Sequence, residues 1–385
     1  MSTLVSLLEP TREAGQASSR LSQPKEISFF SKSRKGVSFD RSGLNTYKKP
    51  ELPVDLNVGF SLFQDRDRTN PYPAPLANIL RSLEEHGQDE ILREATFVTY
   101  RGNIAKLLLV PYNDREEWHM EAERQGETIF LNVVEAPSSL ERQARDGNNP
   151  SRRAMQYWGF AFEEACNAGG AGLQVGVDST EGFNSVSLTS IGEHQLVIAS
   201  EVDCQRGPTS SSGTGGYIEL KTTRLMESQK QVDSFERHKL SKWWAQSYPA
   251  GVPTIVVGFR DDDGFVQKLQ ELETAKLPKY VAGKRFAWDA GVCLSFLNRS
   301  LAWLRGALAA EPEGSRFRLE HSPSRGCRAI RLVRDPSIPP FVPEGVSRLY
   351  SCAGAAVLQP EEGDGGGARG DEAAEPSAKK ARLLQ

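Results

Sequence analysis

The clearest hydrophobic pattern in the chain is a series of apolar residues with helical spacing, predicting a core-facing helix. Its members are Val292, Phe296, Leu297, Leu301, Leu304 and Leu308. The same spacing predicts a second core-facing helix over 154–166, carried by Met155, Trp158, Phe162 and Cys166. A third helix is expected over 228–247, and Pro249 and Gly251 end it.

Short runs of β-branched and other apolar residues predict strands between these helices. The runs lie at 97–101, 104–110, 128–134, 195–203, 217–222 and 254–259. Gly102-Asn103 separates the first two runs and suits the tight turn of a hairpin. Because strands and helices are interspersed, the expected fold class is mixed α/β, with central mixed β-sheets flanked by helices.

The two ends of the chain show no sustained period. Residues 1–25 mix Ser, Gln, Arg and Pro, and residues 359–385 are rich in Gly, Glu and Ala, so both are expected to be disordered tails. No repeat or long linker divides 26–358, which is expected to form one domain. The second tail carries Lys379, Lys380 and Arg382, which form either a nuclear import signal or a solubilising basic end.

Charge and cysteine content exclude several classes of protein. With 47 Lys and Arg against 50 Asp and Glu, the net charge is −3, so any nucleic-acid contact must come from a local basic groove. Five scattered cysteines without metal-ligand spacing fit a reducing compartment. No uncharged apolar stretch reaches about 18 residues, so we expect no membrane span.

Acidic residues alternate with apolar ones on two of the predicted strands. Residues i and i+2 of a strand face the same side, so Glu201 should project with Asp203, and Glu219 with Lys221 from the neighbouring strand. Three carboxylates in apolar surroundings repel one another unless a cation neutralises them. Carboxylate oxygens suit Mg²⁺ or Mn²⁺. The pattern therefore predicts a divalent-metal site.

Lys221 indicates that an anion binds beside the metal. A phosphate and an attacking water supply that anion, and a lysine can orient the water or stabilise the transition state. The alternative is a pair of cross-strand salt bridges on a solvated face of the sheet. Such salt bridges would explain a lone ExK motif without any metal or substrate. The ordered set of ExD, a spacer, ExK, a helix and a further strand favours a nuclease.

Five segments carry a family resemblance, in the same order and at similar spacing over 96–265. They are Tyr100-Arg101-Gly102, Gly159-Phe160-Ala161-Phe162-Glu163, Glu201-Val202-Asp203-Cys204, Tyr217-Ile218-Glu219-Leu220-Lys221-Thr222 and 238–247. With them the chain resembles the restriction-endonuclease-like PD-(D/E)XK nuclease superfamily and, within it, the decapping exoribonuclease family (DXO). The resemblance implies a PD-(D/E)XK-type nuclease core inside the mixed α/β fold.

The resemblance also implies an activity and a set of site residues. Members of the family hydrolyse incompletely capped, triphosphorylated or NAD-capped RNA 5′ ends to a 5′-monophosphate, and some then act as 5′-to-3′ exoribonucleases. Carried over residue by residue, the metal ligands would be Glu163, Asp203, Glu219 and the Leu220 carbonyl, with Glu201 acting directly or through water. Lys221 and Gln246 would hold the water and the scissile phosphate.

Substrate contacts are expected at Tyr100, Arg101, Gly102 and Asn184, in addition to Glu201, Lys221 and Gln246. Arg101 resembles a phosphate clamp, although by itself it is an ordinary charge beside a hairpin. Lys239, Lys242, Trp243 and Gln246 should share one side of their helix and could follow an RNA backbone. By pattern alone, Trp243 and Trp244 are core residues.

Three hypotheses for the function and its binding partners remain open. The leading hypothesis is a nuclear, monomeric enzyme acting on capped, triphosphorylated, NAD-capped or monophosphorylated RNA. A DNA exonuclease would use the same metal core, and the sugar of the substrate distinguishes the two. A non-catalytic stabiliser of a nuclear 5′-to-3′ exoribonuclease is the alternative from another class, against which the intact Glu163, Asp203, Glu219 and Lys221 argue.

Overall fold

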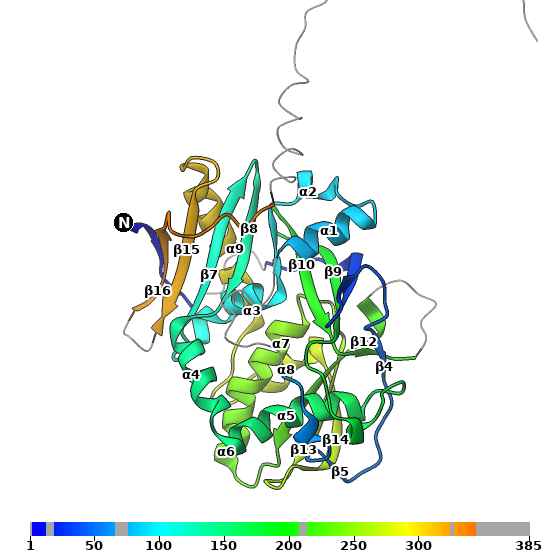
Figure 1. The fold of residues 1–385 in the computed structure, drawn as a ribbon. Coiled ribbons are helices and arrows are strands. Elements are labelled where there is room, and N and C mark those ends of the chain that lie inside the picture. Colours follow the sequence, from blue (N-terminus) through cyan, green and yellow to red (C-terminus); the bar gives the residue numbers. More distant parts are fainter. Residues whose placement is uncertain (1, 13–18, 66–75, 208–213, 324–326, 344–385) are drawn as a thin grey trace, which may run out of the picture.

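The computed structural model describes residues 2–12, 19–65, 76–207, 214–323 and 327–343. Within these ranges the strands form two mixed sheets, one of ten strands and one of six. Figure 1 shows the larger sheet in the upper part of the molecule and the smaller one below it. The mixed α/β class predicted from the sequence is confirmed.

The larger sheet has the order β1-β16-β15-β7-β8-β6-β10-β9-β2-β3. Its central strand β10 runs parallel to β6 and antiparallel to β9, and Leu196 to Ala199 of β10 are fully buried. Its strands are β1 Thr3–Leu8, β2 Lys25–Ser33, β3 Gly36–Ser38, β6 Phe97–Tyr100, β7 Trp118–Gln125, β8 Thr128–Val134, β9 Gly182–Ile191, β10 His194–Val202, β15 Arg316–Ser322 and β16 Cys327–Arg334.

The smaller sheet has the order β4-β11-β12-β13-β14-β5. On β13, Val256 belongs to the apolar cluster with Phe162, whereas Ile255 and Val257 belong to the cluster with Trp244. Both faces of this strand are therefore covered. The strands are β4 Asn45–Thr46, β5 Val54–Asp55, β11 Cys204–Gln205, β12 Tyr217–Arg224, β13 Thr254–Arg260 and β14 Phe265–Glu273.

The three predicted helices are present. The helices are α1 Ala77–Glu85, α2 Ile91–Glu94, α3 Arg101–Leu109, α4 Pro137–Gly147, α5 Pro150–Ala165, α6 Gln229–Ser234, α7 Ser241–Ser247, α8 Leu277–Val281 and α9 Ala290–Ala309, with a π-helix at Phe235–Leu240 between α6 and α7. All six apolar residues predicted for α9 are buried. The prediction that Met155 faces the core is wrong, because its side chain is 43% exposed.

The predicted hairpin around Gly102-Asn103 is also wrong. The chain leaves β6 at Tyr100 and enters helix α3 at once. In this helix Ile104, Leu107 and Leu108 are buried at helical spacing. A short apolar run fits a buried strand and a buried helix equally well, and β6 lies between two parallel partners that only crossovers can reach.

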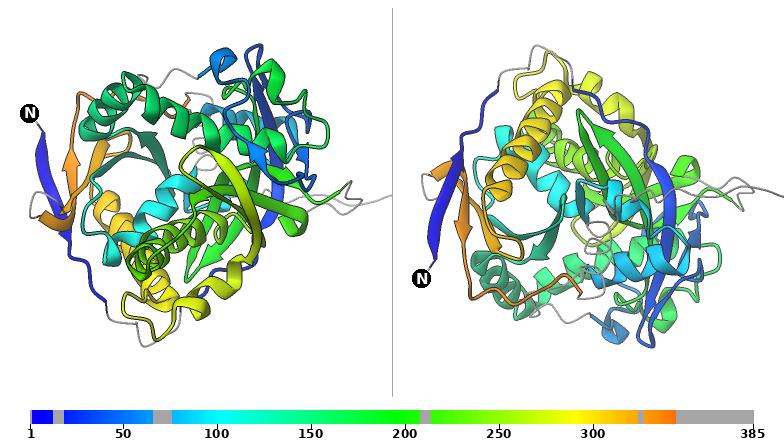
Figure 2. Two further views of the ribbon diagram at one scale, coloured as in Figure 1. Left: turned by 90° about the horizontal axis from the view of Figure 1, so that it is seen from below. Right: turned by 90° about the horizontal axis from the view of Figure 1, so that it is seen from above.

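The expectation of a disordered tail over 1–25 is wrong for the residues that form β1. This strand pairs antiparallel with β16 from Thr3 to Leu8, and Figure 2 shows the dark blue β1 beside the orange β16 at one side of the molecule. Its partner lies near the other end of the chain, so no local pattern indicates the pairing. The predicted tail at 359–385 lies outside the described residues, and the single domain over 26–358 stays a prediction.

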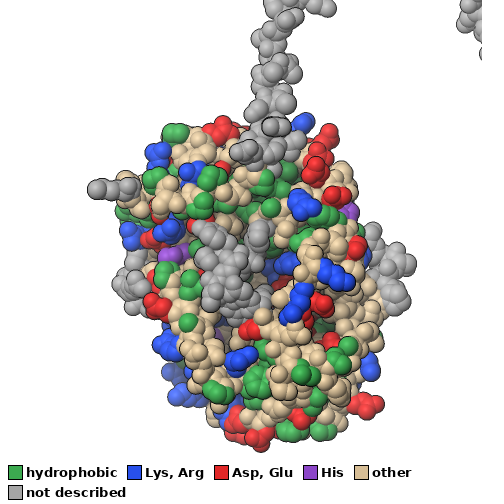
Figure 3. All heavy atoms as spheres, viewed as in Figure 1, with side chains coloured by type: hydrophobic (Ala, Val, Ile, Leu, Met, Phe, Trp, Pro, Cys, Tyr) green, Lys and Arg blue, Asp and Glu red, His purple; other side chains and the backbone are tan. Residues whose placement is uncertain are grey.

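No helix in the described ranges is both long and apolar enough to cross a membrane. Positive and negative side chains are intermingled on the face seen in Figure 3, in keeping with the small net charge. An anionic ligand is therefore attracted by local groups and not by the overall charge.

Candidate active site

Asp203 lies where the chain passes from one sheet to the other. β10 of the larger sheet ends at Val202, and β11 of the smaller sheet begins at Cys204 and pairs with β12. Asp203 occupies the single position between them, and its Oδ2 accepts a hydrogen bond of 2.6 Å from the backbone N–H of Leu220. The prediction that Asp203 lies on the same strand as Glu201 is thus wrong by one residue. The strands of Glu201 and Glu219 belong to different sheets, and of β10 and β11 it is β11 that pairs with β12.

Glu219 is the centre of a buried ion-pair cluster. Its side chain is 0% exposed. Arg101 donates to both of its oxygens, at 2.6 and 3.2 Å, and Lys221 Nζ lies 2.5 Å from Oε1. Burial alone would raise the pKa of Glu219, but Arg101 and Lys221 outweigh it and lower the pKa to about 2. Glu219 and Lys221 therefore share one face of β12, as predicted.

Arg101 reaches this cluster from the first turn of α3. The helix starts directly after Tyr100, which is 7% exposed at the end of β6. A Cβ added at Gly102 would meet nothing within 4 Å, so there is open space beside the start of the helix. The backbone N–H groups of a first helical turn lack partners within the helix and favour anions. Tyr100, Arg101 and Gly102 thus form a helix start at which an anion would be stabilised.

Glu163 is brought to the carboxylates by α5. Asn149 caps this helix through the N–H groups of Ser151 and Arg152, and Phe162 packs against the smaller sheet in one apolar cluster with Leu220 and Val256. Burial, followed by the charge of Asp203, raises the pKa of Glu163 well above its ordinary value. The space beside Gly159, one turn before Glu163, is open.

Asp203 has the same electrostatic character. Burial and the charge of Glu219 raise its pKa from 3.8 to about 7, although Lys221 and Arg101 act in the opposite direction. Glu163 and Asp203 are partly buried, and the positive charge near them is too small to offset their desolvation and mutual repulsion. This is the condition that a divalent cation with oxygen ligands would satisfy. The donor chemistry of Glu163, Asp203 and Glu219 therefore fits a metal ion.

The positions of the side chains show what must change when a metal binds. In the described part of the chain, no three His, Cys, Asp or Glu side chains converge closely enough to hold an ion as they stand. Glu219 is engaged by Arg101 and Lys221. A metal using Glu219 therefore has to compete with these two cations for its oxygens, and Arg101 would then be released toward an anionic ligand.

Glu201 and Asn184 lie opposite each other on β10 and β9. Glu201 is exposed, and its charge contributes to the raised pKa values of Glu163 and Arg101. Asn184 is 1% exposed, and its Nδ2 has no partner among the described residues. An unpaired buried amide marks a position where a ligand or water could accept its hydrogen bond.

Gln246 lies on α7 and lines a cavity that also reaches Gly102. Within the described ranges, no hydrogen bond joins its side chain to the carboxylates. Lys242 lines the same cavity and also a second one, which it shares with Lys239. Lys239 donates to Thr223 Oγ1 at 2.8 Å. The predicted shared side is therefore confirmed for Lys239 with Lys242 and for Lys242 with Gln246, whereas Lys239 and Gln246 line different cavities. The π-helix contains an extra residue per turn and changes the register before α7.

Trp243 and Trp244 are 6% and 1% exposed, and Trp243 packs edge-on against Phe235. The core interpretation of both residues is confirmed. Sequence reasoning missed Lys106, Arg115 and Arg237, which line the cavity beside Gln246. They come from separate segments, and the only available signal was the proximity of Arg237 to the recognised helix motif.

Comparison with known proteins agrees with this geometry. Residues 22–347 match the sequence family described as RAI1 like PD-(D/E)XK nuclease. The decapping and exoribonuclease protein of Homo sapiens is 34% identical over 307 residues, covering 75% of this chain and 76% of that protein.

Two solved structures share the fold. S. pombe Rai1 in complex with 3′-FADP has a TM-score of 0.70 and 27% identity, covering 86% of this chain and 99% of that one. Candida albicans Rai1 in complex with pU5 and Mn²⁺ has a TM-score of 0.78 with 20% identity, covering 90% and 99%. The latter likeness shows the fold alone.

Proposed function

The chain belongs to the RAI1-like PD-(D/E)XK nuclease family, and on this premise we propose that it hydrolyses defective 5′ ends of RNA. It removes incomplete, triphosphate or NAD caps and leaves a 5′-monophosphate. It then shortens the RNA from the 5′ end with the same site. The observation that carries this proposal is the cluster of Arg101, Glu219 and Lys221 beside two carboxyl groups with raised pKa values.

A divalent cation, Mg²⁺ or Mn²⁺, is the cofactor of this proposal. Glu163, Asp203, Glu219 and the Leu220 carbonyl would hold it, with Glu201 in direct or water-mediated contact. When bound, such an ion acidifies water and stabilises charge on phosphoryl oxygens.

The chain's own residues bind and orient the substrate. Arg101, released from Glu219, places its guanidinium against a phosphate at the start of α3, where the backbone N–H groups add to the attraction. Lys221 Nζ stabilises the developing negative charge on the phosphate. Gln246 can donate to a phosphate oxygen and accept from the attacking water. Each role needs an anion in the site, which a purely structural salt-bridge cluster does not.

The test is incubation of the full chain with 5′-labelled RNAs bearing a triphosphate, an unmethylated cap, a methylated cap or NAD, with Mg²⁺ or Mn²⁺. Release of the cap from at least one RNA, with a 5′-monophosphate left behind, is the expected result. DNA of the same sequence is the control for the DNA exonuclease alternative. Absence of hydrolysis on every RNA would leave the stabilising-partner alternative.

We also propose a nuclear location and a monomeric state. The support for the first is Lys379, Lys380 and Arg382 in the C-terminal sequence, and these residues lie outside the described ranges. The support for the second is that one chain supplies every residue of the candidate site. A variant with all three basic residues changed to alanine should lose nuclear accumulation. An unchanged distribution in cells would remove that role, and light scattering would test the monomer.

A nuclear 5′-to-3′ exoribonuclease is the protein partner of this proposal, because the monophosphorylated product suits such an enzyme. Co-purification of the two proteins from nuclear extract, with the catalytic carboxylates intact and changed, would test the association separately from hydrolysis.

A further inference from the structure

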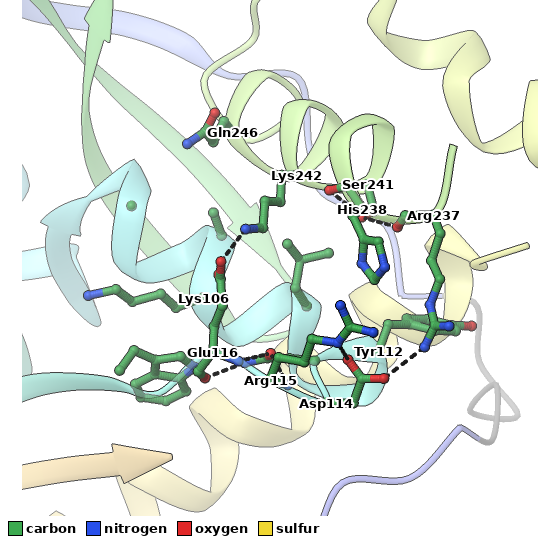
Figure 4. A pocket seen from close by; sticks show the side chains of 15 residues that line it. Lys106, Tyr112, Asp114, Arg115, Glu116, Arg237, His238, Ser241, Lys242 and Gln246 are labelled. Atoms are coloured by element: carbon green, nitrogen blue, oxygen red, sulfur yellow. Dashed lines mark hydrogen bonds and ion pairs between the residues drawn. The ribbon is translucent and has the colours of Figure 1, made fainter. Parts of the chain in front are cut away.

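A groove of 450 Å³ lies between α3 and the helical segment 235–247, next to the candidate site. We call it the helix groove. One wall is a single face of α3, formed by Gly102, Ala105, Lys106 and Leu109. The other wall is formed by Arg237, His238, Ser241, Lys242 and Gln246, and the loop residues Tyr112 to Glu116 with Trp118 complete it. Figure 4 shows the Lys242 side chain pointing toward Glu116, and Arg115 and Arg237 pointing toward Asp114.

Positive charge exceeds negative charge in the helix groove. Arg115 and Arg237 share one carboxylate, that of Asp114, at 3.7 and 2.8 Å. Lys242 pairs with Glu116. Lys106 adds a fourth cation against these two acidic residues, and its Nζ donates to the His119 carbonyl at 3.2 Å. Burial, followed by the charges of Arg237 and Arg115, lowers the pKa of His238, as expected beside an excess of positive charge.

A buried donor in the groove has no partner. The Trp118 side chain is 5% exposed, and its Nε1–H has no acceptor within the described ranges. A buried donor left without an acceptor is unfavourable by about 1–3 kcal/mol. This nitrogen is itself covered, so the groove offers its guanidinium and ammonium groups to a ligand that carries acceptor oxygens.

The two ends of the helix groove differ. Its inner end is formed by Gly102 and Gln246, beside Arg101. At its outer end the Arg115 side chain is 74% exposed, so the groove is open to solvent there. A cap is the terminal group of the RNA and needs no exit. The strand on the 3′ side of the scissile phosphate must leave the protein, and a groove that opens outward between cations provides its path.

We propose that the helix groove binds the ribose-phosphate strand on the 3′ side of the scissile phosphate, with Arg115 and Arg237 holding a phosphate. This inference rests on the proposed function. A volume of 450 Å³ lies within the range of about 300–1,000 Å³ for small-ligand sites, so the groove holds a short stretch of nucleotides. The guanidinium pair gives the enzyme a preference for longer RNA without reading its sequence.

The test compares binding of a short and a longer RNA. Dissociation constants of 5′-monophosphorylated di- and pentauridylate with hydrolysis-resistant phosphorothioate linkages are measured on the full chain with Mn²⁺. In the double variant Arg115→Ala/Arg237→Ala, the Kd of the pentanucleotide should rise roughly tenfold, because charge-assisted hydrogen bonds to phosphate are removed. The Kd of the dinucleotide should stay within about twofold. The slope of log Kd against log salt should fall by about 0.7 for each phosphate that the protein no longer neutralises.

The matched control is Arg224→Ala/Lys239→Ala, which also removes two cations. These residues line a neighbouring cavity of 410 Å³, which shares His238 and Lys242 with the helix groove but includes neither Gly102 nor Gln246. The control should keep the wild-type preference for the longer RNA. An equal loss in both double variants, or an unchanged preference in Arg115→Ala/Arg237→Ala, would overturn the inference.

A second variant guards against loss of folding. Asp114→Asn removes the carboxylate that competes for both guanidinium groups, so it should tighten pentanucleotide binding by a few-fold, an effect that a damaged fold does not produce. Weaker or unchanged binding would contradict the inference.

Two further measurements separate the sources of failure. If Arg115→Ala/Arg237→Ala weakens binding of cap dinucleotides instead of longer RNA, the groove is a cap site and the inference is wrong. Hydrolysis of natural 5′-modified RNAs by the wild type is measured in parallel. If no RNA is hydrolysed, the proposed function is refuted. The dissociation constants test separately whether the helix groove binds the RNA strand.

Discussion

Glu219 differs from the other carboxylates because its charge is already balanced by two cations. Changing Glu219 to Ala would leave Arg101 and Lys221 without their partner, and breaking a buried pair is destabilising by about 3–5 kcal/mol. Glu219→Gln keeps the shape and removes the charge. We expect it to abolish 5′-end hydrolysis at saturating Mn²⁺ while near-UV circular dichroism stays native.

Asp203→Ala should abolish hydrolysis as well, but for this variant relief of carboxylate repulsion should preserve the fold. Labelled-RNA assays measure both variants. Normal turnover in either would contradict the assignment of these residues to the site.

The raised pKa of Asp203 also predicts how the stability of the metal-free protein depends on pH. Its pKa is raised from 3.8 to about 7, so the folded protein binds this proton more tightly than the unfolded chain does. The resulting stabilisation is fully present below about pH 4 and is lost as pH rises toward 7. Asp203→Asn removes the titrating group, and its side-chain oxygen can still accept from Leu220 N–H. In EDTA at pH 8 the Tm of Asp203→Asn should exceed that of wild type by roughly 2 °C or more.

The difference in Tm should shrink as pH falls to 4, where both side chains are neutral. Excess Mn²⁺ should reverse the order at pH 8, since only the carboxylate is a good ligand. A metal-free Asp203→Asn protein that melts below wild type at pH 8 would show that this carboxylate is not strained.

Gln246 tests positioning separately from metal binding. It is neutral and lies on α7, beside the open end of α3. Gln246→Ala should lower kcat by roughly ten- to thousandfold, as expected for a lost positioned hydrogen bond. The midpoint of a Mn²⁺ titration should hardly change, and cap removal and exonucleolysis should fall together. A shifted midpoint at full maximal rate, or the loss of only one activity, would refute this role.

At the residue scale, local spacing predicted the contact between Glu219 and Lys221 because i and i+2 of a strand share a face. It did not predict the pairing of Arg101 with Glu219, which are far apart in sequence and come from a helix and a strand. It also placed Asp203 on a strand, since nothing in the sequence marks the one-residue passage between two sheets.

At the scale of elements, the packing of α5 on β13 places Glu163. A Cβ added at Gly258 of β13 would lie 2.8 Å from the ring of Phe162, the residue next to Glu163. Gly258→Ala should push the helix outward, with a loss of about 1–3 kcal/mol in stability from overpacking. Because Glu163 moves with the helix, the Mn²⁺ concentration that gives half-maximal hydrolysis should rise as well.

Gly306→Ala is the control for this change, because a Cβ there meets nothing within 4 Å and the residue lies on α9. Urea unfolding and metal titration compare the two variants. An unchanged metal midpoint in a destabilised Gly258→Ala protein would show that α5 does not set the position of Glu163.

Long periodic segments such as α9, and β-branched runs such as β8, could be predicted from the sequence because burial imposes the period directly. Helix α3 could not, since 104–110 is too short for its period to distinguish helix from strand. The π-helix at 235–240 could not either, because its extra residue leaves no compositional signal.

At the scale of the whole molecule, β1 joins the two ends of the described chain. It covers the edge of β16, and Ser6 Oγ lies 2.9 Å from Trp303 Nε1 of α9. Deleting residues 2–9 should lower stability and expose an edge that promotes aggregation. The kcat should stay within about twofold, because the strand lies far along the sheet from β10. Urea unfolding, light scattering and RNA hydrolysis measure the three effects.

The pairing of Thr3 with Arg334 also has a consequence for biosynthesis. Strand β1 leaves the ribosome long before β16 and has to wait for it before the two can pair. At about 5–20 residues per second, the delay is roughly fifteen seconds to a minute. During this time many nascent chains on one messenger each present a free, partly apolar N-terminal segment to their neighbours. We therefore expect a chaperone that covers β1 during synthesis to reduce aggregation of the nascent chains.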